Sequence, residues 1–225
     1  MYMQIMYSRG LLDKMIHMNF LNQYDVTGVC VEIGGHTGDS GGSNTYFFEY
    51  MLGHKAFLIE PSAPSFNQLV ANRPNATTLN YAVAYTDCNV ELFGLNEMAS
   101  TVDETRGNSS LVSAMPLRNM LAPYSLTYVD LFVVDVEGGE LMILETFDWN
   151  IEVGIILVEL LSFNTNKMYN SHRDKDEKVI KFLVQRGFQY EFSDNECSNL
   201  IWRNPDYVRH ATNFKGTPDL NARHL

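Results

Sequence analysis

Short apolar runs without polar alternation constrain the fold of this chain more than any other feature. The clearest runs are GVCVEIG (28–34), KAFLIEP (55–61), YVDLFVVDVEGGE (128–140) and VGIILVELLSF (153–163). Strands with one face in water alternate apolar and polar residues, whereas strands covered on both faces are almost continuously apolar. The four runs therefore predict a sheet buried between two layers of helices.

Helix-like segments separate these runs, so strands and helices alternate along the chain. The predicted helices cover residues 44–52, 62–73, 139–147 and 174–187, and a third strand is expected over 76–85. The pattern weakens between 86 and 127, where 90–95 resembles a short strand and LRNMLAPY a short helix. FQYEF and NLIWR flank SDNECS and predict a terminal hairpin. The fold class is α/β, a Rossmann-like, doubly wound, mostly parallel seven-stranded sheet with a C-terminal antiparallel hairpin.

No repeat or linker divides the chain, so we expect a single domain over residues 1–225. It comprises an N-terminal helical segment (1–25) and a C-terminal tail (205–225). The formal net charge of −11 argues against a nucleic-acid partner bound by phosphate neutralisation. No apolar run approaches the roughly 20 residues that span a bilayer. The N-terminus does not resemble a signal peptide, and we expect a cytoplasmic protein.

The glycine-rich segment after the first run, GGHTGDSGG, predicts a ligand-binding loop. Its glycines do not follow the dinucleotide spacing, and it has no lysine for a nucleotide phosphate. Glu32 stands two residues before Gly34 and favours a ligand with positive charge. Glu60 ends the second strand about 20 residues beyond Gly38, where such folds hold a ribose. A ribose with cationic groups and no phosphate matches S-adenosylmethionine.

Four blocks in the same order resemble the FkbM-type methyltransferases, a group of class I S-adenosylmethionine-dependent enzymes. These blocks are VEIGGHTGD, LIEPSAPSFNQLVAN, VDLFVVDVEGGELMILE and IILVEL, and the Asp-x-Glu-Gly-x-Glu order in the third is the most specific. The chain departs from the family at Val133, where a lysine is common, in a longer SGGSN segment, and over residues 164–225. The resemblance implies a methyltransferase and leaves its acceptor open.

The strand ends supply the candidate catalytic residues. Asp135 is the first candidate at the reaction centre, and Glu159 could orient the acceptor. Asp135, Glu137 and Glu159 could also hold a divalent metal such as magnesium, which would lower the pKa of an acceptor hydroxyl. His172 could act as the base because its pKa lies near neutrality. Ordinary roles stay open for each: a helix cap, acids that favour a helix N-terminus, a buried structural acid or a solvated histidine.

Cofactor contacts are predicted at both ends of the ligand. Glu32 is expected at the methionine amino group, with Glu60 on the ribose hydroxyls. The remaining predicted contacts are Gly34 and Gly38 for close backbone approach, Pro61 and Val83 beside the adenine, and Ser110, which the family resemblance places near the cofactor.

The sequence thus favours an O-methyltransferase. Its small-molecule or glycan acceptor is expected from the family resemblance, with a sugar hydroxyl as the preferred target. N-methylation of a small molecule or protein, and a non-catalytic module that binds the cofactor or a sugar, are the alternatives. Whether the sequence is a small enzyme or one domain of a larger glycan-processing protein stays open.

Overall fold

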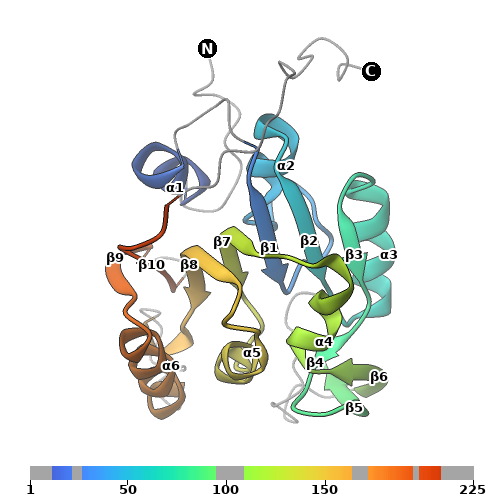
Figure 1. The fold of residues 1–225 in the computed structure, drawn as a ribbon. Coiled ribbons are helices and arrows are strands. Elements are labelled where there is room, and N and C mark those ends of the chain that lie inside the picture. Colours follow the sequence, from blue (N-terminus) through green and yellow to red (C-terminus); the bar gives the residue numbers. More distant parts are fainter. Residues whose placement is uncertain (1–11, 22–26, 95–108, 164–171, 195–197, 209–225) are drawn as a thin grey trace.

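The computed structural model of the chain describes residues 12–21, 27–94, 109–163, 172–194 and 198–208. Its centre is a seven-stranded sheet with the strand order β3-β2-β1-β7-β8-β10-β9 (Figure 1). The strands of this sheet are β1 (Val29–Ile33), β2 (Lys55–Ile59), β3 (Thr77–Leu79), β7 (Tyr128–Val134), β8 (Glu152–Glu159), β9 (Gln189–Asp194) and β10 (Asn199–Arg203).

The directions of the strands confirm the predicted sheet. The five neighbouring strands from β3 to β8 run parallel, and β10 runs antiparallel to both β8 and β9. The chain builds from β1 outward to β3 and then returns to β7 on the other side of β1. The order therefore reverses between β1 and β7, which is where sheets of this kind bind their ligands, beyond the carboxyl ends of the strands.

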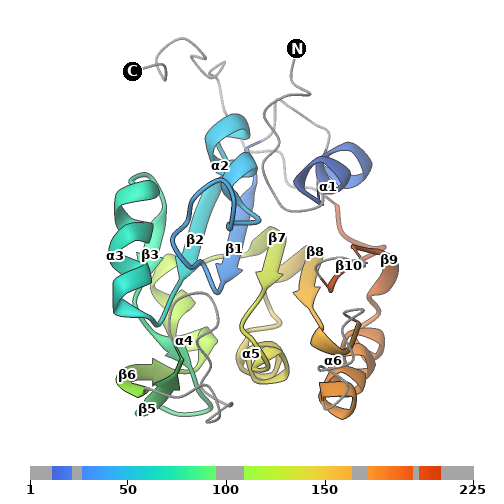
Figure 2. The same ribbon diagram turned by 180° about the vertical axis from the view of Figure 1, so that it is seen from behind.

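Two helical layers enclose the sheet (Figures 1 and 2). One layer contains α1 (Leu12–Phe20), α2 (Tyr46–Leu52) and α3 (Ala63–Asn72), and the other contains α4 (Leu117–Leu121), α5 (Glu140–Thr146) and α6 (Arg173–Gln185). Alternate strand residues point into the two layers: Cys30 and Leu131 pack with α1 and α2, whereas Val31 and Phe132 pack with α4, α5 and α6. This burial on both faces explains why the strand runs lack polar alternation.

Local signals in the sequence set the limits of the first two crossover helices. α2 ends at Leu52 and is capped by Gly53, which adopts a left-handed conformation (φ +69°) and donates its N–H to the carbonyls of Phe48 and Glu49. Glycine is the residue that adopts this helix-ending geometry without strain. α3 follows Ser62 and carries Pro64 in its first turn, where the missing proline N–H breaks no helical hydrogen bond.

A second, three-stranded sheet occupies the region where the sequence pattern weakens. It contains β4 (Ala82–Val83), β5 (Cys88–Phe93) and β6 (Ser109–Met115), in the order β4-β6-β5. The strand predicted over 76–85 is therefore wrong as a single element: β3 ends at Leu79, and the side chain of Asn80 donates to the carbonyls of Glu60 and Pro61. The chain turns there and enters the small sheet as β4.

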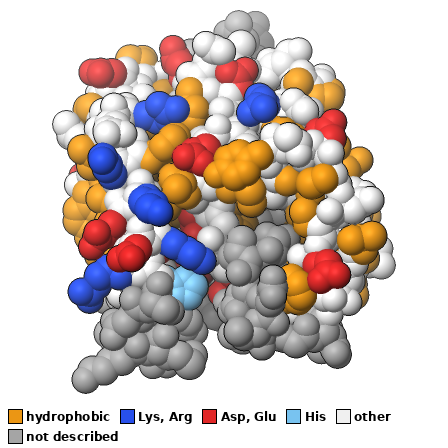
Figure 3. Space-filling view, turned by 90° about the horizontal axis from the view of Figure 1, so that it is seen from below, with side chains coloured by type: hydrophobic (Ala, Val, Ile, Leu, Met, Phe, Trp, Pro, Cys, Tyr) orange, Lys and Arg blue, Asp and Glu red, His pale blue; other side chains and the backbone are white. Residues whose placement is uncertain are grey.

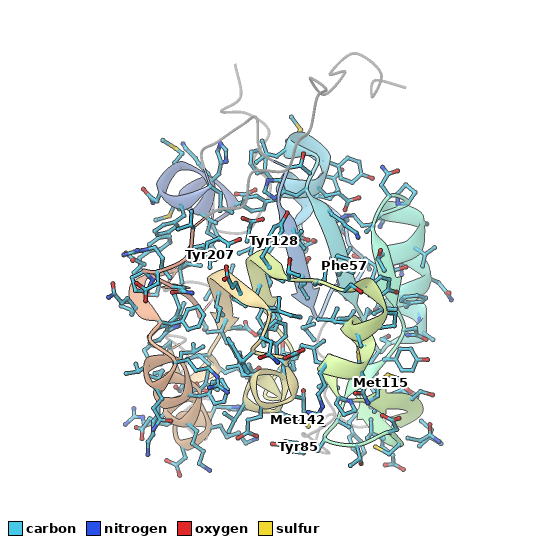
Figure 4. The ribbon with its side chains drawn as sticks, in the orientation of Figure 1. Phe57, Tyr85, Met115, Tyr128, Met142 and Tyr207 are labelled. Atoms are coloured by element: carbon cyan, nitrogen blue, oxygen red, sulfur yellow. The ribbon has the colours of Figure 1, made fainter. Side chains whose placement is uncertain are left out.

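The small sheet is fastened to the main body beside α5. The hydroxyl of Tyr85, just after β4, donates to Glu145 of α5, and Figure 4 labels Tyr85 at this lower edge.

At the opposite, amino edge, Asp130 accepts hydrogen bonds from the N–H of Val29 and the hydroxyl of Tyr207 (Figure 4). Within the described residues, no helix is long and apolar enough to cross a membrane.

The tight turn after β1 should make Gly34 indispensable for folding. Gly34 has φ +91°, and a Cβ atom on it would collide with the carbonyl oxygen of Asp135. We expect Gly34→Ala to lose more than about 4 kcal/mol of unfolding free energy or to give no folded protein. Gly53→Ala is the matched control, because Gly53 also has a positive φ but open space around it; it should cost about 1–2 kcal/mol. Equal losses in urea unfolding would contradict this role of Gly34.

Candidate active site

Four strand ends with acidic residues meet at the carboxyl edge of the parallel sheet. Glu32 lies in β1, Glu60 directly follows β2, Asp135 directly follows β7, and Glu159 ends β8. Because Val134 pairs with Val158, the next residues, Asp135 and Glu159, lie beside each other. Figure 2 shows the arrowheads of β1, β7 and β8 ending on the same side of the molecule. The sequence prediction that these acids converge at one edge agrees with this topology.

The first two glycines of the loop serve contacts within the protein. The N–H groups of Gly34 and Gly35 both donate to the carbonyl of Ile59, which binds the start of the loop to the end of β2. Gly38 (φ +66°) lies against Leu69 of α3 and against Arg73, the residue that follows this helix, so a side chain there would collide with them. The close approach that these glycines permit is therefore made to β2, β7 and α3.

Glu32 is buried (1% exposed) and bound by the loop that follows it. One carboxylate oxygen accepts from the N–H of Asn44, and the other accepts from the hydroxyls of Ser43 and Thr45 at 2.7 and 2.6 Å. A buried carboxylate needs such donors because water is absent. The carboxylate of Glu32 thus fixes the second half of the loop against β1.

A buried arginine completes this arrangement. Arg73, which is 1% exposed, pairs with Glu49 of α2 and donates to the same hydroxyls of Ser43 and Thr45 that bind Glu32. The two hydroxyls accept from the guanidinium and donate to the carboxylate, so they link opposite charges. We refer to Glu32, Ser43, Thr45, Glu49 and Arg73 as the loop-anchoring network.

Asp39 shapes the part of the loop that contains the second glycine pair. Its carboxylate accepts from the N–H groups of Gly41 and Gly42 and from the hydroxyl of Thr37. The hydrogen bond from Thr37 is the main reason why the pKa of Asp39 is lowered, since it favours the ionised form. The Gly41–Gly42 pair is therefore part of an aspartate-stabilised turn.

Glu60 occupies the gap between the β1 loop and the start of α3. Its two carboxylate oxygens accept from the N–H groups of His36 and Ser62, each over less than 3 Å. Burial nevertheless raises the pKa of Glu60 to about 7, because desolvation outweighs these two hydrogen bonds. Each oxygen keeps a lone pair for a further donor.

Asp135 and Glu159 form a hydrogen-bonded carboxyl pair at the ends of β7 and β8. Burial raises the pKa of Glu159 far above its usual value, and the negative charges of Asp135 and Glu137 raise it further. Two adjacent carboxyl groups with little water cannot both ionise readily, so the pair retains a proton. The second carboxylate oxygen of Glu159 is buried and has no hydrogen-bond partner within the described residues.

The turn after β7 brings two more acids close to this pair. Glu137 takes a left-handed conformation (φ +60°), and Glu140 accepts a hydrogen bond from the N–H of Gly138. Burial raises the pKa of Glu140 to about 7, and the nearby charges of Asp176 and Asp135 add to this increase. Asp135, Glu137 and the partly ionised Glu140 therefore give this part of the edge a negative potential, which suits a cationic ligand.

The family follows from the sequence of this same region. The model of the methyltransferase FkbM domain matches residues 32–190, which is more than half of the chain and includes all four strand-end acids. The chain belongs to the FkbM methyltransferase domain family. The predicted enzyme class, an S-adenosylmethionine-dependent methyltransferase, is confirmed by this match.

Solved structures similar to this FkbM domain share little of its sequence. The METTL16 methyltransferase domain is 12% identical, with coverage of 86% of this chain and 66% of that one and a TM-score of 0.49. The SAH-bound Podospora anserina methyltransferase PaMTH1 is also 12% identical, with coverage of 80% of this chain and 72% of that one and a TM-score of 0.48. At such values neither structure supports an argument about ligand or reaction. No curated protein matches the sequence significantly.

The other predicted site residues of the FkbM domain lie in different surroundings. His172 is at the N-terminal end of α6, and the segment before it, 164–171, lies outside the described residues. Pro61 follows Glu60 at the edge, whereas Val83 is buried in the main core on β4. Ser110 is exposed on β6, paired with Leu92 of β5. None of these assignments is tested by a bound ligand, so they stay predictions.

No metal site is evident in the described part of the FkbM domain. Among these residues, no group of three or more His, Cys, Asp or Glu side chains is arranged to hold a metal ion. The suggested metal on Asp135, Glu137 and Glu159 thus has no support from their geometry.

Sequence reasoning missed the residues of the FkbM domain that hold the loop. Arg73, Ser43 and Thr45 were not singled out, because an arginine near a helix end and hydroxyls in a polar loop are ordinary surface features. The only signal was the acid at position 32, inside an apolar run, which needs buried donors if its side chain points inward.

Stability should depend on pH through Glu140. Its pKa is about 7 in the folded state, against 4.5 for an unperturbed group, so the folded protein binds this proton more tightly. The contribution of this group to unfolding free energy is therefore greatest below about pH 4.5 and falls as pH rises to about 7. At about 1.4 kcal/mol per pKa unit, the loss is on the order of 3 kcal/mol.

Urea unfolding of Glu140→Gln between pH 5 and pH 8 measures this effect. The variant should gain stability over the wild type as pH rises, because glutamine keeps the acceptor oxygen and never ionises. Glu91→Gln, a change at an exposed acid on β5, is the control and should show no such gain. A constant difference between Glu140→Gln and wild type across this range would contradict the prediction.

Proposed function

We propose that this FkbM domain binds S-adenosylmethionine at the carboxyl edge of β1, β2 and β7 and methylates a hydroxyl group of a sugar-containing acceptor. The observation that carries the proposal is that Glu60, at the end of β2, and the Asp135–Glu159 pair, at the ends of β7 and β8, lie at the same carboxyl edge of the sheet. These acids flank the point where the strand order reverses. Family membership supplies the reaction class.

The residues present fit this cofactor. Each oxygen of Glu60 accepts only one backbone N–H, so each can accept a further hydrogen bond from a ribose hydroxyl. The negative charges of Asp135 and Glu137 at this edge suit the ammonium and sulfonium charges of the ligand. When bound, S-adenosylmethionine supplies a methyl group on a positively charged sulfur.

We propose that Glu32 acts on the cofactor site indirectly, by holding the loop that follows β1. Its carboxylate already receives hydrogen bonds from Ser43, Asn44 and Thr45. It therefore holds the loop in the shape in which the N–H of His36 binds Glu60. Gly34 and Gly38 contribute in the same indirect way, by allowing the loop to pack against β7 and α3.

Asp135 is proposed as the general base. Glu159 retains the proton of the carboxyl pair and holds Asp135 through their hydrogen bond. Asp135 would then accept the proton of the acceptor hydroxyl, while the bound cofactor would supply the methyl group to that oxygen and retain its sulfur as a neutral thioether. The chain's main contribution is to hold the acceptor oxygen in line with the carbon–sulfur bond. His172 remains the alternative base, at the start of α6.

The cofactor assignment predicts a loss of affinity in Glu60→Gln. The amide can accept from only one of the two N–H donors and cannot match the carboxylate for the ribose hydroxyls, so S-adenosylhomocysteine should bind about 10- to 100-fold more weakly in calorimetry. Glu152→Gln, at the amino edge where β8 begins, should bind as the wild type does. Absence of S-adenosylhomocysteine binding by the wild type would contradict the proposed function.

Transfer of a radiolabelled methyl group from S-adenosylmethionine to a panel of glycans and small hydroxylated acceptors tests the reaction. We expect a glycan or glycoside to be labelled on oxygen. For that acceptor, Asp135→Asn should lower kcat by about 10²- to 10⁴-fold and leave S-adenosylhomocysteine affinity unchanged. Full turnover in Asp135→Asn would remove it from the reaction, and labelling only on nitrogen would overturn O-methylation.

A further inference from the structure

A cavity of about 270 Å³ opens next to the end of β8. It lies between the short 3₁₀ helix η6 (Leu161–Phe163), which follows β8 almost directly, and the first two turns of α6. Its lining residues are Ser162, Phe163, Arg173, Asp176, Glu177 and Ile180. Figure 3 views the molecule from the carboxyl edge and shows acidic and basic side chains interspersed over α6, rather than a patch of one sign.

The cavity is close to the proposed reaction centre. Its lining begins at Ser162, three residues beyond Glu159 at the end of β8, and the charges of Asp176 and Asp135 both raise the pKa of Glu140. Asp176 is buried (3% exposed) and accepts the N–H of Ser162 at 2.8 Å, which fixes η6 to α6. The cavity is thus a formed feature beside the residues to which the proposed function assigns methyl transfer.

The chemistry of the lining combines one apolar surface with opposite charges. Phe163 is 45% exposed, which is high for a large aromatic side chain. Arg173 and Glu177 are exposed in the first turns of α6. Arg173 offers a planar set of N–H donors, and Glu177 offers carboxylate acceptors. An anionic ligand would be repelled by Glu177 and Asp176, whereas a neutral hydroxyl group can both donate to Glu177 and accept from Arg173.

We propose that this cavity is the acceptor subsite and that it takes one neutral sugar ring. The less polar face of the ring lies on Phe163, and its hydroxyl groups donate to Glu177 and accept from Arg173. Sites for drug-sized ligands occupy roughly 300–1,000 Å³, so a cavity just below that range suits a single ring. This subsite proposal depends on the proposed function, because it assigns the acceptor of the proposed methyl transfer.

Binding of simple glycosides tests this subsite without requiring turnover. Methyl α-D-glucopyranoside, methyl α-D-mannopyranoside and methyl α-L-rhamnopyranoside are the probes, measured by saturation-transfer NMR with the protein both free and saturated with S-adenosylhomocysteine. We expect at least one to bind, and Phe163→Ala and Arg173→Ala each to weaken it at least fivefold. S-adenosylhomocysteine affinity should stay unchanged, and Phe163→Tyr should restore glycoside binding.

Two matched controls separate the cavity from general effects of the substitutions. Tyr190 on β9 is an aromatic residue of similar exposure (50%), and Lys181 is an exposed cation further along α6. Tyr190→Ala and Lys181→Ala should bind the glycoside as the wild type does. Equal weakening in the controls, or no binding of any glycoside, would overturn the subsite.

The outcomes also separate this subsite from the cofactor proposal. If S-adenosylhomocysteine binds and no glycoside does, the sugar subsite is wrong and the cofactor proposal stands. If the glycoside binds in a Phe163-dependent manner and S-adenosylhomocysteine does not bind, the cavity is a sugar site and the proposed function is wrong.

Discussion

Arg73 connects the loop at the carboxyl edge of the sheet to the helices beside it. The guanidinium is buried, pairs with Glu49 of α2 and reaches Ser43 and Thr45, which in turn bind Glu32. Opposite charges taken out of water are stable only as a complete set, and removal of one partner of such a set typically costs about 3–5 kcal/mol. The network therefore fixes the loop after β1 in one position, and the backbone of that loop then fixes Glu60 through His36.

A consequence is that the acids at the carboxyl edge divide into two kinds. Glu32 is satisfied by donors from its own loop and contributes shape. Glu60 and Glu140 are buried and Glu159 is partly buried, each with too few donors, and burial raises the pKa of each. Groups held in this way lower stability near neutral pH, and proteins retain such groups where function needs them.

The sheet and the acids at its strand ends were predictable from the sequence because both depend on local patterns. Continuous apolar runs predict strands buried on both faces, and parallel strands bring their carboxyl ends to one edge. The loop-anchoring network was not predictable, because Arg73 lies 28 to 30 residues from Thr45 and Ser43 and only folding brings them together. The small sheet was predicted only in part, as a short strand over 90–95 that overlaps β5, for a related reason: many residues of β5 and β6 are exposed, so those strands lack the apolar pattern of the main sheet.

A crystal structure of the protein with S-adenosylhomocysteine tests the central claim most directly, namely that Glu60 contacts the cofactor and Glu32 shapes the loop. The account predicts ribose hydroxyls within hydrogen-bond distance of both Glu60 oxygens, with Glu32 still bound to Ser43, Asn44 and Thr45. A ligand amino group on Glu32, with the loop released from it, or a ribose remote from Glu60, would contradict the account.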